Sequence, residues 1–247
     1  PAWLERTEAG LAERVRALTA QSRLPLELDT ERAVRWYEER ASIDLAPQQR
    51  QALAQALTAK VMVLTGGPGT GKTTLVRGIL EILERKDVKI LLTAPTGRAA
   101  KRLQESTGRD AKTIHRLLEF QPETRGFARG PENPLSADLV VVDEASMLDE
   151  SLAWSLAKAL ADGARWILVG DVDQLPSIGP GRVLADLIDS GMVEVARLTE
   201  IFRQAEAGRI VINAHRIRDG LMPINAPKGD EDSDFYFIER SEPEAIL

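Results

Sequence analysis

Eight consecutive residues constrain the fold of this chain more than any other feature. Residues 66–73 read Gly-Gly-Pro-Gly-Thr-Gly-Lys-Thr and fill every fixed position of the phosphate-binding pattern G-x-x-x-x-G-K-[ST]. An apolar run at 61–64 precedes them, and apolar residues with helical spacing follow at 74–83. A strand, a glycine-rich loop and a helix N-terminus direct backbone N–H groups and a helix dipole at an anion. The pattern therefore predicts a nucleotide phosphate site and favours it over a plain glycine turn.

The residues of this loop have separate predicted roles. Lys72 is expected to reach the β- and γ-phosphates of a nucleotide, and the Thr73 hydroxyl is expected to bind Mg²⁺. The glycines let the backbone approach the phosphates because they carry no side chain. The predicted phosphate-binding residues are Gly67, Pro68, Gly69, Thr70, Gly71, Lys72, Thr73 and Thr74.

From residue 45 onward, apolar strand patterns alternate with helical patterns. This alternation predicts an α/β fold with a mostly parallel sheet and helices on both faces. The predicted strands are residues 61–65, 89–94, 138–142, 165–170 and 193–198. Residues 1–44 have the spacing of short helices and carry no side chains that suggest chemistry.

Two later segments interrupt the alternation. Residues 119–137 are rich in proline and glycine and place Phe120 and Phe127 on either side of a turn. This composition fits an inserted β-hairpin and a long surface loop equally well. Near the end, an acidic linker at 230–234 precedes an apolar stretch at 235–238 that is predicted to be a new strand.

These patterns divide the chain into three predicted parts. They are a helical segment at 1–44, a main domain at 45–223, and a linker with the start of a second domain at 224–247. The chain begins without methionine and closes on a capping box at 241–244, which normally opens a helix. We therefore expect these residues to be a piece of a longer protein.

Composition narrows the environment. The chain has 247 residues, no cysteine and a formal net charge of −6. Without cysteine there is neither a disulfide nor a thiolate metal site, which suits a reducing cytoplasm. No apolar run approaches the ~20 residues needed to span a membrane, and no signal segment opens the chain. We expect a cytoplasmic protein that does not associate with membranes.

Polar side chains follow two of the predicted strands. Asp143 and Glu144 come directly after one strand, at the edge where open α/β sheets bind ligands. Asp143 is expected to hold Mg²⁺, and Glu144 is expected to orient and deprotonate an attacking water. Gln174 follows the next strand and is a candidate sensor of the γ-phosphate. Beside a complete phosphate loop, these residues favour ATP hydrolysis over a solvated acidic pair.

Basic residues suggest two further contacts. Arg203 follows the last predicted strand and is a candidate cation for the γ-phosphate. Residues 98–116 hold six Lys or Arg residues against two acids, so they carry a local excess of positive charge. That composition suits contact with a nucleic-acid backbone without base reading. A solvated basic helix face is the alternative, and without further context it is the favoured one.

Read in order, these segments resemble the first motor domain of a superfamily-one helicase, specifically of the RecD-like branch. The resemblance covers about residues 45–220 and rests on seven motifs in a fixed order. Beside the phosphate loop they are L-A-P-Q-Q-R at 45–50, L-T-A-P-T-G-R-A-A-K-R-L at 92–103, T-I-H-R-L-L at 113–118, V-V-D-E-A-S-M-L-D at 141–149, L-V-G-D-V-D-Q-L-P-S-I-G-P-G at 168–181 and L-T-E-I-F-R-Q at 198–204.

This resemblance implies a RecA-like fold and a motor that uses ATP and Mg²⁺ to move 5′ to 3′ on single-stranded DNA. Duplex unwinding in DNA repair or recombination is the implied task, with the segment at 119–137 parting the duplex at a junction. Gln49 would read the adenine edge. The implied hydrolytic residues are Lys72, Glu144, Gln174 and Arg203, with Thr73 and Asp143 at the metal. The implied DNA-lining residues are Pro95, Thr96, Gly97, Arg98 and His115.

The sequence departs from the family pattern in one respect, because the motifs of a second motor domain do not occur. That domain would lie beyond Leu247 and supply the other wall of the ATP site, including an arginine finger. A missing finger costs about 10³–10⁵ in rate. The 247 residues alone are therefore expected to bind ATP·Mg²⁺ weakly, to hydrolyse it very slowly and not to unwind DNA. No residue pattern identifies a protein partner.

Other readings of the residues stay open. An AAA+ remodelling ATPase or a nucleotide kinase can share the phosphate loop. AAA+ proteins lack the T-A-P-T-G-R run, and a kinase needs a second substrate pocket and a lid, for which the sequence shows no pattern. A nucleotide-switched DNA-binding module is a non-enzymatic alternative. RNA is an alternative track, because such motors contact the backbone rather than the bases.

Overall fold

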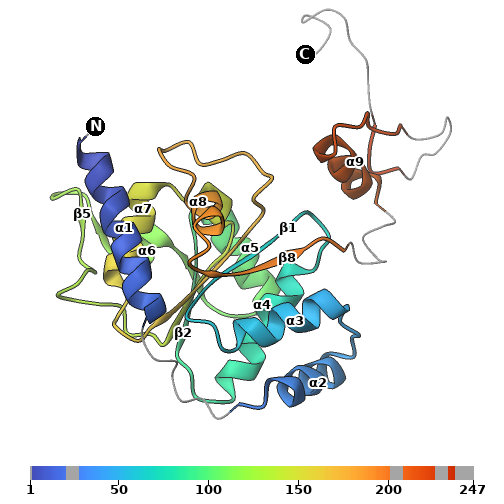
Figure 1. The fold of residues 1–247 in the computed structure, drawn as a ribbon, viewed down its shortest axis with the longest axis horizontal. Helices are drawn as coiled ribbons and strands as arrows, with labels where there is room; N and C mark the ends of the chain where they lie inside the picture. The colour runs from blue at the N-terminus through green and yellow to red at the C-terminus, as the bar shows by residue number, and fades with distance from the viewer. Residues whose placement is uncertain (1, 21–27, 201–207, 226–232, 237–247) are drawn as a thin grey trace, which may run out of the picture.

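The computed structural model describes residues 2–20, 28–200, 208–225 and 233–236. It forms a parallel sheet between two layers of helices (Figure 1). The sheet has six strands in the order β3-β2-β6-β7-β1-β8. They are β1 (Val61–Gly66), β2 (Ile90–Ala94), β3 (Ala111–Thr113), β6 (Leu139–Val142), β7 (Arg165–Gly170) and β8 (Glu194–Leu198). The helices are α1 (Ala2–Ala20), α2 (Thr30–Ala41), α3 (Pro47–Ala56), α4 (Lys72–Glu84), α5 (Gly97–Thr107), α6 (Ile114–Leu117), α7 (Glu150–Ala159), α8 (Val183–Asp189), α9 (Arg209–Arg218) and the 3-10 helix η1 (Ala145–Met147).

The predicted fold class is confirmed. All five predicted strands occur, each within one residue of its predicted ends. The sixth strand, β3, was not predicted because it is only three residues long and lacks an apolar run. It extends the sheet by pairing in parallel with β2, with Leu92 opposite Ala111.

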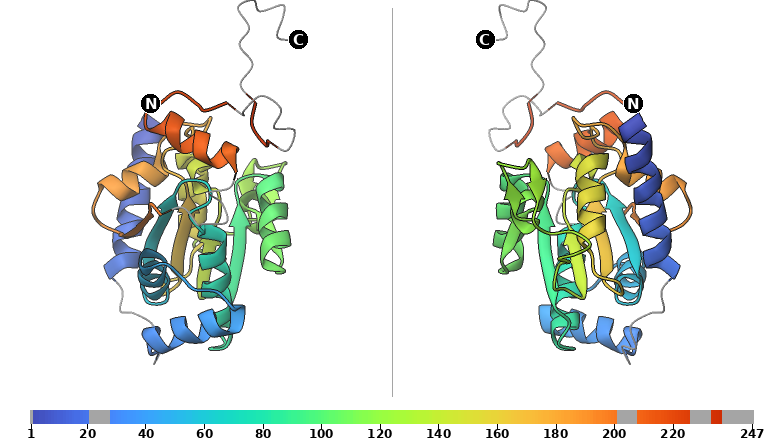
Figure 2. Two further views of the ribbon diagram at one scale, coloured as in Figure 1. Left: turned by 90° about the vertical axis from the view of Figure 1, so that its right-hand side faces the viewer. Right: turned by 90° about the vertical axis from the view of Figure 1, so that its left-hand side faces the viewer.

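The two faces of the sheet carry separate cores, because successive residues of a strand point to opposite faces. On β1, Val61 and Val63 pack in the core formed with α1, α7 and α8. Met62 and Leu64 pack in the core formed with α2, α3 and α4. Figure 2 shows the sheet nearly edge-on with helices on both sides. This two-sided burial explains why the central strands are apolar throughout.

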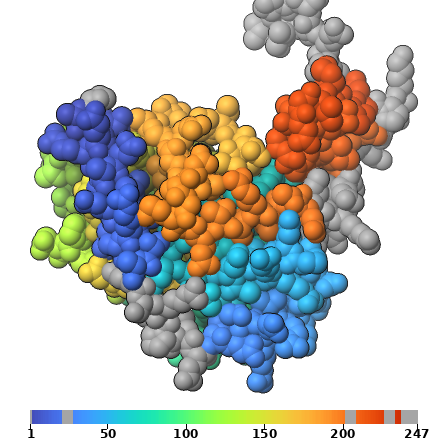
Figure 3. Space-filling model, viewed as in Figure 1, coloured from blue at the N-terminus to red at the C-terminus, as the bar shows by residue number. Residues whose placement is uncertain are grey.

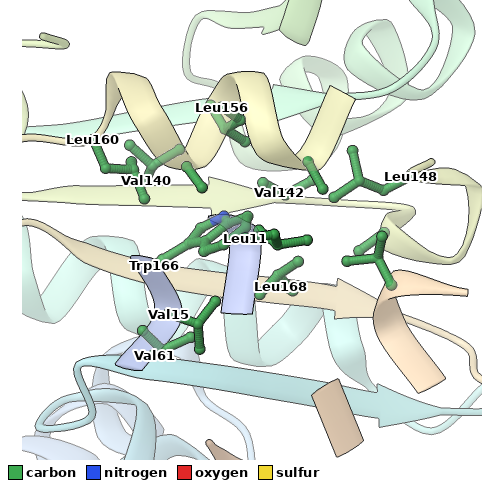
Figure 4. Packing of buried hydrophobic residues seen from close by; sticks show 14 of the residues in the cluster. Leu11, Val15, Val61, Val140, Val142, Leu148, Leu156, Leu160, Trp166 and Leu168 are labelled. Carbon is green, nitrogen blue, oxygen red and sulfur yellow. The ribbon is translucent and has the colours of Figure 1, made fainter. Parts of the chain in front are cut away.

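The N-terminal residues are helical, as predicted, but α1 is a single helix of 19 residues rather than a short one. Its apolar stripe lies on the sheet, where Leu11 and Val15 approach Trp166 (Figure 4). Arg14 also donates from Nη1 to Asp162 at 2.7 Å and from Nε to the carbonyl of Ala157 at 3.2 Å, beside the end of α7. Helix α1 therefore contributes to the same core as the sheet.

The insertion at 119–137 contains a β-hairpin, so the hairpin alternative is confirmed over the loop. Strand β4 (Phe120–Gln121) pairs antiparallel with β5 (Gly126–Phe127). The rings of Phe120 and Phe127 lie 5.5 Å apart, and Phe120 is 43% exposed. The hairpin thus exposes the ring of Phe120, whereas Phe127 is half-buried and packs against the core.

The C-terminal prediction meets the structure only in part. Phe235 and Tyr236 belong to no strand, and the other two residues of the predicted strand at 235–238 lie outside the described residues. The division at 45 and 223 stays a prediction. No helix among the described residues has the length and apolar character required to cross a membrane.

Arg165 is a buried cation at the amino end of β7, with 2% of its surface exposed. It donates to the carbonyl of Ala56, which ends α3, and from Nε to the carbonyl of Ala59 at 2.8 Å. The last carbonyls of a helix lack hydrogen-bond donors within the helix, so the Arg165 guanidinium provides donors for carbonyls at and just beyond the end of α3. Burial lowers the pKa of Arg165 to about 10, so its charge persists at neutral pH.

We expect Arg165→Leu to lower the free energy of unfolding by about 2–4 kcal/mol, because it removes charge-assisted hydrogen bonds and leaves buried carbonyls unpaired. Urea unfolding followed by circular dichroism measures this change. Arg16→Leu on the exposed side of α1 is the matched control. Equal unfolding midpoints for the two variants would contradict a structural role for Arg165.

Candidate nucleotide site

The carboxyl ends of the parallel strands meet at one edge of the sheet, and a cavity of about 720 Å³ opens there. Such edges are where open α/β sheets bind ligands. Its lining residues come from four segments that are far apart in the sequence. They are Pro68, Gly69, Lys72, Thr73, Ala99, Arg102, Glu105, Ser106, Asp143, Glu144 and Gln174. Five predicted catalytic or metal-binding residues are therefore together: Lys72, Thr73, Asp143, Glu144 and Gln174.

The glycine loop connects β1 to α4 as the sequence predicts. Gly69 and Gly71 have φ angles of 77° and 90°, in the left-handed region that residues with a Cβ rarely adopt. The Thr70 hydroxyl is buried and donates to the carbonyl of Gly67 at 2.9 Å. These constraints shape the loop around the N-terminus of α4, where backbone N–H groups favour anions.

Lys72 is the cation of this cavity that lies on the loop itself. Its Nζ donates to the carbonyls of Gly66 at 2.5 Å and Gly67 at 3.0 Å. Burial lowers the pKa of Lys72, and the carboxylates of Asp171, Glu144 and Asp143 oppose that shift. The ammonium group is therefore partly desolvated and close to acidic groups, which suits it to binding a polyphosphate.

Asp143 and Glu144 follow the buried strand β6. The Asp143 amide donates to the carbonyl of Thr93 at 2.9 Å, which fixes the end of β6 to β2. Burial raises the pKa of Asp143, and the Glu144 carboxylate raises it further. Removing a carboxylate from water costs free energy, and Lys72 and Arg102 offset that cost only in part. A bound Mg²⁺ would remove that cost.

Glu144 itself has an unusual backbone. Its φ of 53° and ψ of 41° lie in the left-handed region, which is uncommon for a residue with a side chain. The residue precedes η1, and the end of β7 lies against that turn. A Cβ at Gly170 would stand 3.0 Å from the backbone nitrogen of Ser146. The turn therefore requires a glycine at position 170 of the neighbouring strand. Left-handed backbone angles such as those of Glu144 are often found at functional sites.

Asp171 is a site residue that sequence reasoning did not identify. It is 4% exposed, and its Oδ2 accepts from Nε2 of Gln174 at 3.4 Å. The Asp171 carbonyl also accepts from the Gln174 amide at 3.1 Å. This carboxylate therefore positions Gln174 at the cavity. The signal available in the sequence was its place as the first residue after β7.

Helix α5 contributes the other residues that were missed. Arg102, Glu105 and Ser106 line the cavity, and Arg102 is exposed to it. In the sequence, residues 98–116 form one basic stretch that suits a nucleic-acid contact, although a solvated helix face is the favoured interpretation. The structure instead turns part of α5 toward the nucleotide cavity, where Arg102 lowers the pKa of Asp143 against the effect of burial.

Gln49 lies behind the glycine loop and is 2% exposed. Its Nε2 donates to the carbonyl of Thr70 at 2.8 Å, and its Oε1 accepts from the Ala46 amide at 3.0 Å. The Gln49 side chain therefore holds the glycine loop to the start of α3 through these two hydrogen bonds. Contact with an adenine edge stays a prediction.

His215 is a further residue beside the loop that the sequence did not indicate. It is 8% exposed, and its Nε2 lies 3.1 Å from the carbonyl of Pro68. A Cβ at Gly67 would stand 2.7 Å from Cε1 of this ring, so only glycine allows the contact. Helix α9 is thereby held against the phosphate loop.

The predicted DNA-lining residues occupy a different part of the same sheet edge, after β2 and β3. Thr96 begins α5, where its Oγ1 accepts from the Ala99 amide at 3.2 Å. Gly97 and Arg98 are exposed, and Pro95 is half-buried. His115 is exposed on α6, with its ring 5.7 Å from Phe120 of the hairpin. A DNA contact for this set stays a prediction.

Arg203 and the metal site are the two remaining predicted features. Arg203 lies outside the described residues. Among the residues that are described, no group of three or more His, Cys, Asp or Glu side chains could hold a metal ion. The oxygen donors that line the cavity include the Thr73 hydroxyl and the adjacent carboxylates of Asp143 and Glu144. This set fits Mg²⁺, which binds few protein ligands and completes its shell with phosphates and water.

Known proteins resemble this chain in sequence. Residues 49–180 match the family described as AAA domain. The ATP-dependent RecD2 DNA helicase of Deinococcus radiodurans is 41% identical over 179 residues, which are 72% of this chain and 24% of the relative. The RecBCD enzyme subunit RecD of Mycobacterium tuberculosis is 38% identical over 223 residues, covering 79% of this chain and 38% of the relative. The chain thus spans well under half the length of these two relatives.

A solved structure resembles the chain in fold. The crystal structure of the Pif1 helicase from Candida albicans superposes with a TM-score of 0.54 at 26% sequence identity. The match covers 73% of this chain and 45% of that protein. Its similarity agrees with the RecA-like arrangement of strands and helices described above.

Proposed function

Because this chain belongs to the AAA domain family and is homologous to RecD and RecD2 helicases, we propose that it is the ATP-hydrolysing part of a DNA motor. The observation that carries this proposal is the cavity at the sheet edge. It gathers a loop lysine, a hydroxyl, a carboxylate pair and an amide, which are Lys72, Thr73, Asp143, Glu144 and Gln174. Phosphoryl transfer to water requires this combination of charge neutralisation and water activation.

The proposed chemistry assigns one task to each side chain. Lys72 and the loop backbone bind the phosphates of ATP, and Thr73 and Asp143 would hold Mg²⁺, which neutralises developing charge. Glu144 accepts a proton from the attacking water. Gln174, held by Asp171, orients that water and the γ-phosphate. Arg203 and the arginine finger of a second motor domain are proposed to complete the site.

The proposed track is single-stranded DNA along the exposed residues that follow β2 and β3. Arg98 and the N-terminus of α5 offer positive charge and backbone N–H groups to phosphates. His115 and the hairpin add aromatic rings, on which bases can stack. Movement 5′ to 3′, separation of duplex at a junction and a role in DNA repair are proposed from the resemblance of the motifs to the RecD-like branch.

An ATPase assay on the longest natural chain tests this function. We expect single-stranded DNA to stimulate turnover more than RNA does, and 5′-tailed duplexes to be unwound in preference to 3′-tailed ones. Preference for 3′ tails would contradict the RecD-like assignment. Comparable DNA-stimulated turnover by the 247 residues and by a longer chain would contradict a second wall of the ATP site.

We expect Arg98→Ala to weaken binding of single-stranded DNA about equally for all sequences, because a phosphate contact reads no base. The slope of log affinity against log salt should fall by about 1 for a lost phosphate contact. Fluorescence anisotropy with labelled oligonucleotides at several salt concentrations measures this slope. Arg35→Ala, on the exposed side of α2, is the control that should retain the original slope. If both variants lose affinity equally, only overall charge matters.

A further inference from the structure

A second cavity lies on another side of the molecule, between α1, α8 and the start of α7. Its volume is about 380 Å³, and it shares no lining residue with the nucleotide cavity. In Figure 3, α1 (blue) lies directly against the segment that includes α8 (orange). The nucleotide chemistry proposed above does not use this cavity.

The lining of this cavity combines an apolar wall with negative charge. The apolar wall consists of Leu4, Leu11, Ala12, Val15, Val183, Leu187 and Met192. Three acidic residues, Glu8, Glu150 and Asp186, also line it. The remaining lining residues are Gly181 and Ser190, so no lysine or arginine lines it among the described residues. We call this surface the acidic cavity.

Glu150 is the unusual member of the acidic cavity. It is the first residue of α7 and is 6% exposed, yet its Oε1 is buried without a hydrogen-bond partner. Its backbone amide donates to the carbonyl of Pro180 at 3.0 Å, which holds the adjoining loop over it. A buried carboxylate oxygen without a hydrogen-bond partner is costly, and native proteins rarely keep one without a reason.

The charged groups around Glu150 do not neutralise its negative charge. Burial raises the pKa of Glu150, and the carboxylates of Glu8, Asp186 and Asp149 raise it further. Arg182 is the nearby cation on the loop before α8, but it lies 4.0 Å from Asp186 and its side chain is 67% exposed. Arg182 does not line the cavity. Within the part of the chain that the structure describes, no positively charged side chain therefore neutralises Glu150.

We propose that the acidic cavity binds the arginine or lysine side chain of a protein segment that docks between α1 and α8. The cationic head would pair with Glu150, and its aliphatic stem would lie along Leu11 and Leu187. Long cationic side chains bury their stems on apolar surface in this way. A protein segment fits better than a free small cation, because the apolar wall extends over two helices and would cover neighbouring apolar side chains as well.

Methyl NMR of the 247-residue chain tests this proposal. The chain has four methionines, and Met192 alone among them lines the acidic cavity. The probe is the tripeptide acetyl-Leu-Arg-Leu-amide, titrated into protein carrying 13C-methyl methionine, with Met192→Leu to assign the resonance. We expect the Met192 methyl signal to shift saturably while that of exposed Met222 stays unchanged.

Variants of the acidic residues test whether the guanidinium of the tripeptide binds at Glu150. Glu150→Gln is expected to weaken tripeptide binding about tenfold or more, as for a lost charge-assisted hydrogen bond. Glu8→Gln provides a second variant at an exposed position of the cavity. Glu13→Gln, exposed on α1 outside the cavity, is the matched control and should leave the affinity unchanged.

Three results would overturn the proposal. They are no shift at Met192, equal affinity in Glu150→Gln and Glu13→Gln, or equally tight binding of acetyl-Leu-Gln-Leu-amide. If butylguanidinium binds as tightly as the tripeptide, the site takes small organic cations and the protein-segment assignment is wrong. These measurements need no ATP, so their outcome is independent of the proposed hydrolytic function.

Discussion

Glu144→Gln should reduce ATP turnover by about 10²–10⁴-fold, which is the usual contribution of a general base. The amide has almost the shape of the carboxylate but accepts protons far more weakly, so water activation is lost. ATP binding should persist, because Lys72 and the loop backbone remain. Radiolabelled phosphate release measures turnover, and equilibrium binding of a fluorescent ATP analogue measures affinity. The variant therefore separates catalysis from binding.

This substitution also tests the non-enzymatic alternative. A nucleotide-switched binding module would respond to ATP equally in wild type and Glu144→Gln, whereas a motor would lose DNA-dependent turnover. Glu39→Gln, exposed on α2 and far along the chain from the cavity, carries the same charge change and should keep wild-type activity. Retained turnover in Glu144→Gln would assign proton transfer to another group.

The parts of the fold that the sequence predicted are those set by local pattern. The strand β6 is apolar throughout because both of its faces are covered, and β1 is followed by a loop whose glycines have required backbone angles. The strand β3 was not predicted because three residues at a sheet edge show too little hydrophobic alternation to be recognised as a strand. Its existence depends on β2 beside it, not on its own composition.

The residues of the candidate site also divide into those that local sequence patterns predicted and those that they did not. Lys72 could be predicted because it fills a fixed position of the phosphate-loop pattern, and Asp143 because it directly follows β6. Parallel strands bring their carboxyl ends to one edge, so both residues lie at the same cavity. Arg102 and His215 could not be predicted, since their positions depend on how α5 and α9 pack beside the phosphate loop. Gln49 was assigned from resemblance alone, and its hydrogen bonds place it beneath the loop. Contacts between distant segments thus limited the prediction.

Lys72→Ala should reduce both nucleotide affinity and turnover, in contrast to Glu144→Gln. Removing one preorganised donor to developing charge costs about 10²–10³ in rate. Nucleotide affinity should fall as well, because Lys72 contributes to the ground state and to the transition state alike. The same turnover and binding assays measure both quantities. Lys158→Ala on α7, where the ammonium lies over the ring of Trp154, is the control for loss of a lysine.

The hydrogen bonds of Lys72 within the loop also determine how the alanine variant should be interpreted. Its Nζ already lies on the carbonyls of Gly66 and Gly67, so the variant removes two loop contacts together with the charge. Lys72→Arg restores the charge with a different shape and should recover little activity, because a planar guanidinium does not replace a compact ammonium in a tight loop. Equal losses of turnover in Lys72→Ala and Lys72→Arg would mean that the shape of the lysine side chain, and not its charge alone, is required for activity. Full recovery in Lys72→Arg would show that charge alone is sufficient and would contradict a fixed phosphate contact through Nζ.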